Sequence, residues 1–154
     1  AVERAHLTQT IGIPGDEFKF YDGSGGGPAT ATNNAIIEIL QYYSEQDVFP
    51  AFFDALPVLA VDGSLGFVTD FEADPTLAGA KGNVFAKTGT YATGAQNRLL
   101  LEGQGLAGYI DAKSGRRLAY SLRVDNTLLG TDIQDVLEVF QDQGTISAII
   151  WRDH

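Results

Sequence analysis

Cysteine and methionine are both absent from the sequence, and histidine occurs only twice, at His6 and His154. Without cysteine the protein has no disulfides, no catalytic thiolate and no cysteine-ligated zinc site. The two histidines stand alone near the termini, so they supply neither a metal cluster nor the base of a Ser-His-Asp triad. We therefore predict no metal site.

Basic residues are also scarce. The chain has 10 Lys and Arg against 20 Asp and Glu, which gives a net charge of -10 at pH 7. Because nucleic-acid backbones are negatively charged, such a chain repels them, and no nucleic-acid partner is predicted. Long apolar runs are missing as well, and no basic start leads into an apolar stretch, so neither a transmembrane segment nor a signal peptide is predicted.

The chain is nevertheless long enough for a substantial core. Its 154 residues are 44% apolar, and a domain of this size buries roughly 68–70% of the surface of its unfolded chain. No internal repeat and no strong linker interrupts it, so we expect one domain over residues 1–154. The start at Ala1-Val2-Glu3-Arg4 and the lack of methionine indicate a processed or excised piece, with ordinary trimming of the first residues as the alternative.

The spacing of apolar residues predicts helices first, then strands, then one more helix. The first part opens with a helix tail in 1–13, a turn at Pro14-Gly15-Asp16 and a strand at 18–21. A glycine-rich loop at 22–28 follows. After it come a helix that is capped by Thr32-Asn33-Asn34 and ends near Ser44, and a short helix over 48–56. Strand patterns then cover 83–88, 106–112 and 118–125, with a tight turn at 113–116. A closing helix over 133–151, in which Gly144 is a potential break, covers one face of the sheet. This order predicts an α+β fold in which helices flank an antiparallel sheet.

One short motif carries chemistry. Ala86-Lys87-Thr88-Gly89-Thr90 stands at the end of a predicted strand, just before a turn, where a sheet edge can present a cation and hydroxyls to a ligand. Lys-Thr-Gly is one of three elements, with Ser-x-x-Lys and Ser-Asp-Asn, that mark class A β-lactamases and penicillin-binding proteins. Three common residues are a weak signal by themselves, so the surrounding sequence decides.

Five landmarks, this motif among them, follow one another along the chain. They are Asp22-Gly23-Ser24-Gly25, Ile39-Leu40-Gln41-Tyr42, 56–65, 86–90 and Leu106-Ala107-Gly108-Tyr109-Ile110. Their order and spacing over residues 20–125 resemble the D-Ala-D-Ala carboxypeptidase/endopeptidase family, the class C penicillin-binding proteins. Two stretches differ from the family pattern: Gly26-Gly27-Pro28 after the first landmark, and an apparent insertion within 91–103.

The resemblance implies the C-terminal part of a transpeptidase/β-lactamase-like domain that lacks its upstream strands and its nucleophile helix. It also implies that the intact protein is an enzyme, a serine D-Ala-D-Ala carboxypeptidase or endopeptidase working outside the cytoplasmic membrane, in the periplasm or extracellularly. Its ligands would be peptidoglycan stem peptides and β-lactams, and no cofactor is implied. The obligate partner would be the upstream segment of the same polypeptide.

The resemblance further assigns roles to single residues. Lys87 would assist proton transfer near the nucleophile and attract the terminal carboxylate of the substrate, to which Thr88 and Thr90 would donate their hydroxyls. The backbone N–H of Thr90 would form half of an oxyanion hole, and Gly89 would let the strand approach the ligand closely. Catalysis is therefore expected at Lys87, Thr88 and Gly89, and substrate binding at Thr88 and Thr90.

The nucleophile itself is missing. None of the serines at 24, 44, 64, 114, 121 and 147 is followed by lysine three residues later, and no Ser-x-Asn occurs. In the family both motifs lie upstream of the first landmark, so this chain alone is expected to be inactive. Two other functions stay open: a non-catalytic stem-peptide binding module that keeps the carboxylate cradle but has lost acylation, and an acidic α+β domain with coincidental motifs.

Other candidate residues are interpreted as structural. Ser24 and Ser64 each follow Asp-Gly, but neither stands in a Gly-x-Ser-x-Gly elbow or beside a base, so both are predicted to be turn residues. The carboxylates of Asp70, Glu72 and Asp74 fit no EF-hand spacing and are predicted to form a solvated loop.

Overall fold

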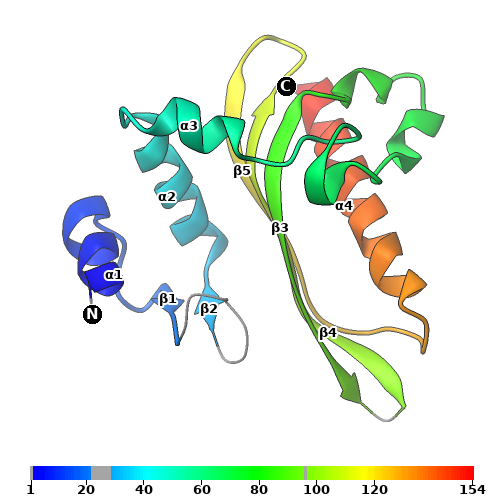
Figure 1. The fold of residues 1–154 in the computed structure, drawn as a ribbon, viewed down its shortest axis with the longest axis horizontal. Coiled ribbons are helices and arrows are strands. Elements are labelled where there is room, and N and C mark those ends of the chain that lie inside the picture. The colour runs from blue at the N-terminus through cyan, green and yellow to red at the C-terminus, as the bar shows by residue number, and fades with distance from the viewer. Residues whose placement is uncertain (1, 22–28, 96) are drawn as a thin grey trace. The chain divides into compact units, whose positions relative to one another are not determined.

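A computed structural model of the chain describes residues 2–21, 29–95 and 97–154 (Figure 1). Two compact units make up the chain, Ala1–Asp54 and Ala55–His154. Helices and antiparallel strands are both present, which confirms the α+β class. The glycine-rich loop predicted at 22–28, and with it the first landmark, lies outside the described residues.

The first unit opens with a helix and a small sheet. α1 (Val2–Ala5) continues into a π-helical segment, His6–Ile11, that ends at Gly12. The φ of Gly12 is 95°, a left-handed conformation that glycine adopts readily at the end of a helix. The two-residue strands β1 (Phe18–Lys19) and β2 (Thr30–Ala31) then pair antiparallel, which confirms a strand at 18–21 in shorter form.

Two helices complete the first unit, and the predicted cap at Thr32 is confirmed. The Thr32 Oγ1 atom accepts a hydrogen bond from the Ala35 N–H at 3.0 Å, which starts α2 (Asn33–Ser44). α3 (Phe49–Asp54) is shorter than the predicted 48–56.

The second unit is built on a three-stranded antiparallel sheet in the order β3-β4-β5. Its strands are β3 (Val84–Ala95), β4 (Arg98–Asp111) and β5 (Arg117–Leu128), so the predicted meander is confirmed. The tight turn between β4 and β5 is also confirmed, because Gly115 has a left-handed φ of 87° and its N–H donates to Ala112 O at 2.8 Å.

The stretch expected as an insertion, 91–103, extends the hairpin of β3 and β4. The two strands stay paired out to Ala95 and Arg98, with one bulge at Glu102. The Thr93 hydroxyl donates to Glu102 Oε1 at 2.7 Å. The sequence pattern missed this extension because glycine and alanine, which are frequent in 89–95, favour strands weakly.

A single core fills the space on one face of the sheet. Three short 3-10 helices, Gly63–Leu65, Asp70–Ala73 and Ala78–Ala80, and the long α4 (Gln134–Asp153) cover this face (Figure 1). The buried members of the core are Leu59, Ala60, Leu65, Val68, Phe71, Leu77, Ala80, Val84, Ala86, Leu106, Ile110, Tyr120 and Ala148. Since side chains alternate along a strand, burial of Val84 and Ala86 sends the side chains of Phe85 and Lys87 to the opposite face.

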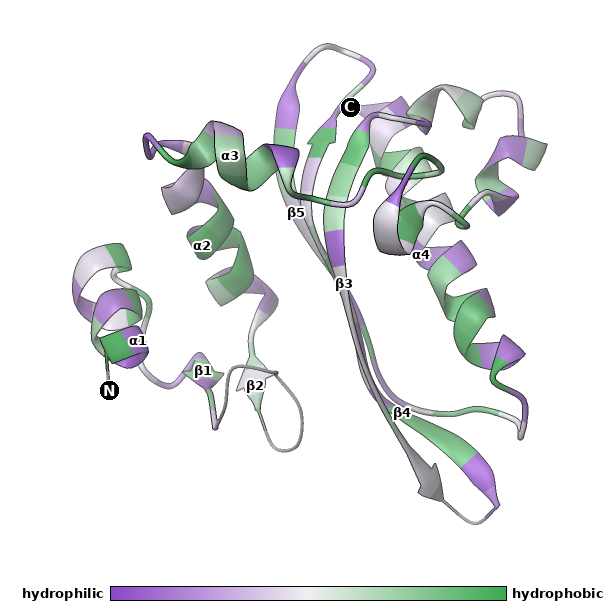
Figure 2. Cartoon of the chain, viewed as in Figure 1, coloured by the Kyte–Doolittle hydropathy of each residue, from purple (hydrophilic) through white to green (hydrophobic). Residues whose placement is uncertain are grey.

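α4 is unbroken, so the potential break at Gly144 is not realised. A Cβ atom at this position would lie 2.2 Å from Val68 Cγ1. Glycine is therefore a packing requirement here and not a helix end. Figure 2 shows hydrophobic and hydrophilic residues alternating along α4, as expected for a helix with one buried side. Among the described residues, no helix has the length and apolar content needed to cross a membrane.

Gly144→Ala should destabilise the protein, although alanine favours helices over glycine by about 1 kcal/mol. Overpacking against Val68 costs about 1–3 kcal/mol, which outweighs that gain. Denaturant titration should show a lower free energy of unfolding for Gly144→Ala, and Gly144→Ala/Val68→Ala should recover part of the loss relative to Val68→Ala. A Gly144→Ala protein more stable than wild type would contradict this packing.

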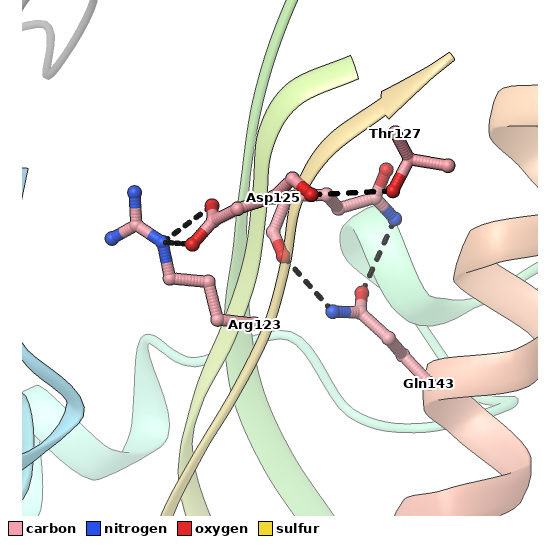
Figure 3. A network of polar contacts seen from close by, with 5 residues as sticks. Arg123, Asp125, Thr127 and Gln143 are labelled. Carbon is pink, nitrogen blue, oxygen red and sulfur yellow. Dashed lines mark hydrogen bonds and ion pairs between the residues drawn. The ribbon is translucent and has the colours of Figure 1, made fainter. Parts of the chain in front are cut away.

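A buried amide pair fastens α4 to β4. Gln143 Nε2 donates to the Gln104 backbone O at 3.0 Å, and Gln104 Nε2 donates to Gln143 Oε1 at 3.2 Å. Figure 3 shows Gln143 reaching from α4 to the sheet, and Arg123 paired with Asp125 on β5. Because buried polar groups need partners, the two amides fix how α4 is placed along β4.

Candidate active site

The Lys-Thr-Gly motif lies on β3, which is an edge strand of the sheet. Residues 57–59 cover part of the free edge through two hydrogen bonds. The Leu59 N–H donates to Val84 O at 2.9 Å, and the Ala86 N–H donates to Pro57 O at 2.9 Å. Backbone groups alternate between the two sides of a strand, so the N–H and C=O groups of Thr88 and Thr90 point to this same edge. No described strand pairs with the edge there. The motif thus offers backbone donors and acceptors beyond the covered part.

Lys87 is exposed and lies on the face of β3 opposite the core. Its Nζ donates to Thr88 O at 2.6 Å, so the ammonium group curls back to the free edge of the strand. An ammonium has three donors, and no carboxylate of the described residues forms an ion pair with Lys87. The Lys87 ammonium can therefore bind an anionic group that approaches the free edge of β3.

Thr88 turns its side chain the other way. It is only 9% exposed, and its Oγ1 donates to Ser64 Oγ at 2.9 Å. Ser64 does lie in a turn, the 3-10 helix Gly63–Leu65. The turn, however, brings its hydroxyl against the motif, a contact that the sequence pattern did not indicate.

Gly89 and Thr90 are both exposed. A Cβ atom on Gly89 would meet nothing within 4 Å, whereas one on Gly108, the partner of Ala86 in β4, would lie 2.1 Å from Phe85 O. Packing therefore requires glycine at 108 and not at 89. The space over Gly89 is compatible with close approach of a ligand.

Three of the five landmarks contact one another around β3. The segment 56–65 supplies the Ser64 contact and the bridge between Val58 and Phe85. The segment 86–90 is the motif itself, and 106–110 pairs with it in β4. The landmark at 39–42 lies in α2, in the first unit. The order of the landmarks along the sequence indicated the family, but it did not show which landmarks are in contact.

The acidic residues near position 72 have local partners. Glu72 pairs with Lys81 at 3.0 Å, and Asp74 Oδ1 accepts a hydrogen bond from the Thr76 N–H at 2.8 Å. Hydrogen bonds from the side chain and the backbone of Thr76 lower the pKa of the Asp74 carboxyl. Within the described ranges, no group of three or more His, Asp or Glu side chains could hold a metal ion.

The histidines lie on elements other than β3. The Nε2 atom of His6 is 3.2 Å from the Tyr43 hydroxyl, within the first unit. His154 is the last residue of the chain, directly after α4. Neither therefore accompanies Lys87 on β3.

The D-Ala-D-Ala carboxypeptidase 3 (S13) family matches residues 1–144, nearly the whole chain. The chain belongs to this family. No curated protein gives a significant match. Membership of the S13 family confirms the relationship predicted from the five landmarks, and the helix-flanked antiparallel sheet agrees with the predicted part of a transpeptidase-like domain. The S13 match extends over both units.

Proposed function

We propose that this chain forms the Lys-Thr-Gly side of the active site of a serine D-Ala-D-Ala carboxypeptidase or endopeptidase. Its substrate is the stem peptide of peptidoglycan, so it works outside the cytoplasmic membrane. A serine outside this chain, on the upstream segment of the same polypeptide, is acylated by substrate or by a β-lactam. The observation that carries the proposal is the ammonium of Lys87 at the free edge of β3, in a chain of the S13 family.

Lys87 would supply the positive charge of the site. A peptide ending in D-Ala-D-Ala carries a terminal carboxylate, and charge-assisted hydrogen bonds to such a group are roughly twice as strong as neutral ones. The Thr88 and Thr90 hydroxyls would add neutral donors. A site of this kind binds the carboxyl terminus of a peptide substrate, as a carboxypeptidase requires.

The Thr90 N–H would stabilise the reaction's negative charge. The serine oxygen attacks the scissile carbonyl and gives its proton to a base, and the carbonyl oxygen becomes an oxyanion. The base then gives that proton to the leaving nitrogen as the C–N bond breaks and D-alanine is released, and water hydrolyses the acyl-enzyme. One donor aimed at such an oxyanion contributes about 2.7–4 kcal/mol to transition-state stabilisation.

The proposal is tested with the complete protein, meaning the polypeptide that also carries the acylated serine. It should release D-alanine from a stem pentapeptide ending in D-Ala-D-Ala, and benzylpenicillin should block the release. Binding of the peptide without release would instead favour the non-catalytic binding module. Neither binding nor release would contradict both functions.

Thr88→Val should raise the KM for a peptide with a free terminal carboxylate by roughly 10-fold or more, because a hydrogen bond to a charged group contributes about 1.5–3 kcal/mol. The matching C-terminal amide should be affected less, since it lacks the charged acceptor. Steady-state kinetics on the two peptides measures the difference. An equal rise in KM for both peptides would show that the Thr88 hydroxyl does not bind the terminal carboxylate.

A further inference from the structure

The loop before β3, residues 57–66, has a well-defined scaffold of its own. The Ala60 N–H donates to Leu65 O at 3.0 Å and closes the loop. Asp62 Oδ1 accepts a hydrogen bond from the Val58 N–H at 2.9 Å. Leu65 is almost fully buried and anchors the loop in the core. Together with its bonds to the edge of β3, these contacts hold the loop in one place.

Two residues of this loop have a left-handed backbone. The φ angles of Ala60 and Gly63 are 58° and 56°, and for alanine this conformation is unfavourable because of its Cβ atom. A Cβ on Gly63 would also lie 3.0 Å from Pro57 Cβ. Unfavourable backbone conformations persist where the surrounding structure imposes them, often at functional sites. In this loop the left-handed conformations of Ala60 and Gly63 place Ser64, the residue after Gly63, against β3.

Ser64 meets the motif through its hydroxyl. Its Oγ accepts from Thr88 Oγ1 at 2.9 Å, and Ser64 itself is half-buried. A hydroxyl has one donor and two acceptor positions. A buried hydroxyl without a partner is costly, so the contact with Ser64 sets the direction of the Thr88 hydroxyl. The same Thr88 accepts from the Lys87 ammonium through its backbone O.

We propose that Ser64 is a positioning residue of the carboxylate site, which orients the hydroxyl of Thr88 toward the substrate. The role rests on the proposed function, because it requires a carboxylate at Thr88. With no carboxylate bound, Thr88 donates to Ser64. When a carboxylate binds, the Thr88 proton turns to it, and the Ser64 O–H donates to Thr88 Oγ1 in return. Hydroxyls in series polarise one another, which strengthens the bond to the carboxylate.

The test uses the complete protein with Ser64→Ala, Ser64→Thr, Thr88→Val and Ser64→Ala/Thr88→Val. The matched control is Ser114→Ala, an exposed serine in the turn between β4 and β5. Each is assayed on a D-Ala-D-Ala peptide with a free carboxylate and on its C-terminal amide, and its melting temperature is measured. Ser64→Ala should raise the KM for the free acid about 2- to 10-fold with little effect on the amide. Ser64→Thr should restore most of the loss, and the double variant should resemble Thr88→Val alone.

The outcomes separate this role from the proposed function. If wild type hydrolyses the peptides and Ser64→Ala leaves the ratio of the two KM values unchanged, Ser64 has no positioning role. Additive losses in the double variant, or a loss that only follows the melting temperature, would overturn it equally. A wild-type protein that hydrolyses neither peptide would contradict the proposed function itself, and the role of Ser64 with it.

Discussion

Lys87→Ala in the complete protein is expected to lower both β-lactam acylation and D-Ala-D-Ala hydrolysis by roughly 10²–10³-fold, the scale for removing one preorganised electrostatic contact from an acyl-transfer site. Stopped-flow acylation by a fluorescent penicillin and D-alanine release measure the two rates. Lys87 is exposed, and its side chain lies on the face of β3 away from the core. Its removal should therefore change the free energy of unfolding by no more than about 1 kcal/mol.

The control for this variant is Lys113→Ala, which removes an exposed lysine from the turn between β4 and β5. It changes the net charge equally, so a general electrostatic effect would appear in both variants. If Lys87→Ala kept full acylation, or lost activity only in step with a lower melting temperature, the motif would be structural.

Local features of the fold could be predicted from the sequence. The cap at Thr32 and the turn at 113–116 were predictable because the deciding contacts lie within a few residues, between Thr32 and Ala35 and between Ala112 and Gly115. The closing helix was likewise clear from its apolar spacing.

Features that depend on distant contacts could not be predicted in this way. β3 extends through 89–95 because β4 pairs with it, although its own residues favour strands weakly. The break at Gly144 was a wrong expectation because the pattern around α4 does not show that Val68 fills the space of a Cβ.

In the candidate site, too, local features could be predicted from the sequence and distant contacts could not. The motif at Lys87 to Thr90 was recognisable from residue types, and the landmarks around it predicted the family. The contact between Ser64 and Thr88 joins residues 24 positions apart. It depends on left-handed backbone at Ala60 and Gly63, and alanine gives no signal for such a conformation.

Two of the serines that the structure describes donate to backbone oxygens and not to a base. Ser44 donates to Gln41 O, and the buried Ser147 donates to Gln143 O. A serine hydroxyl is a weak nucleophile unless a positioned base accepts its proton. Because the sequence also has no Ser-x-x-Lys and no Ser-x-Asn, we expect acylation to need a serine from outside residues 1–154.

Intact-mass analysis after incubation with a penicillin tests most directly whether the acylated serine lies outside this chain. It is applied in parallel to this chain alone and to the complete protein. We expect no adduct on the chain alone and one penicilloyl adduct on the complete protein, at a serine upstream of this chain and strongly reduced by Lys87→Ala. A covalent adduct on the chain alone, or a complete protein that penicillin does not acylate, would contradict this expectation.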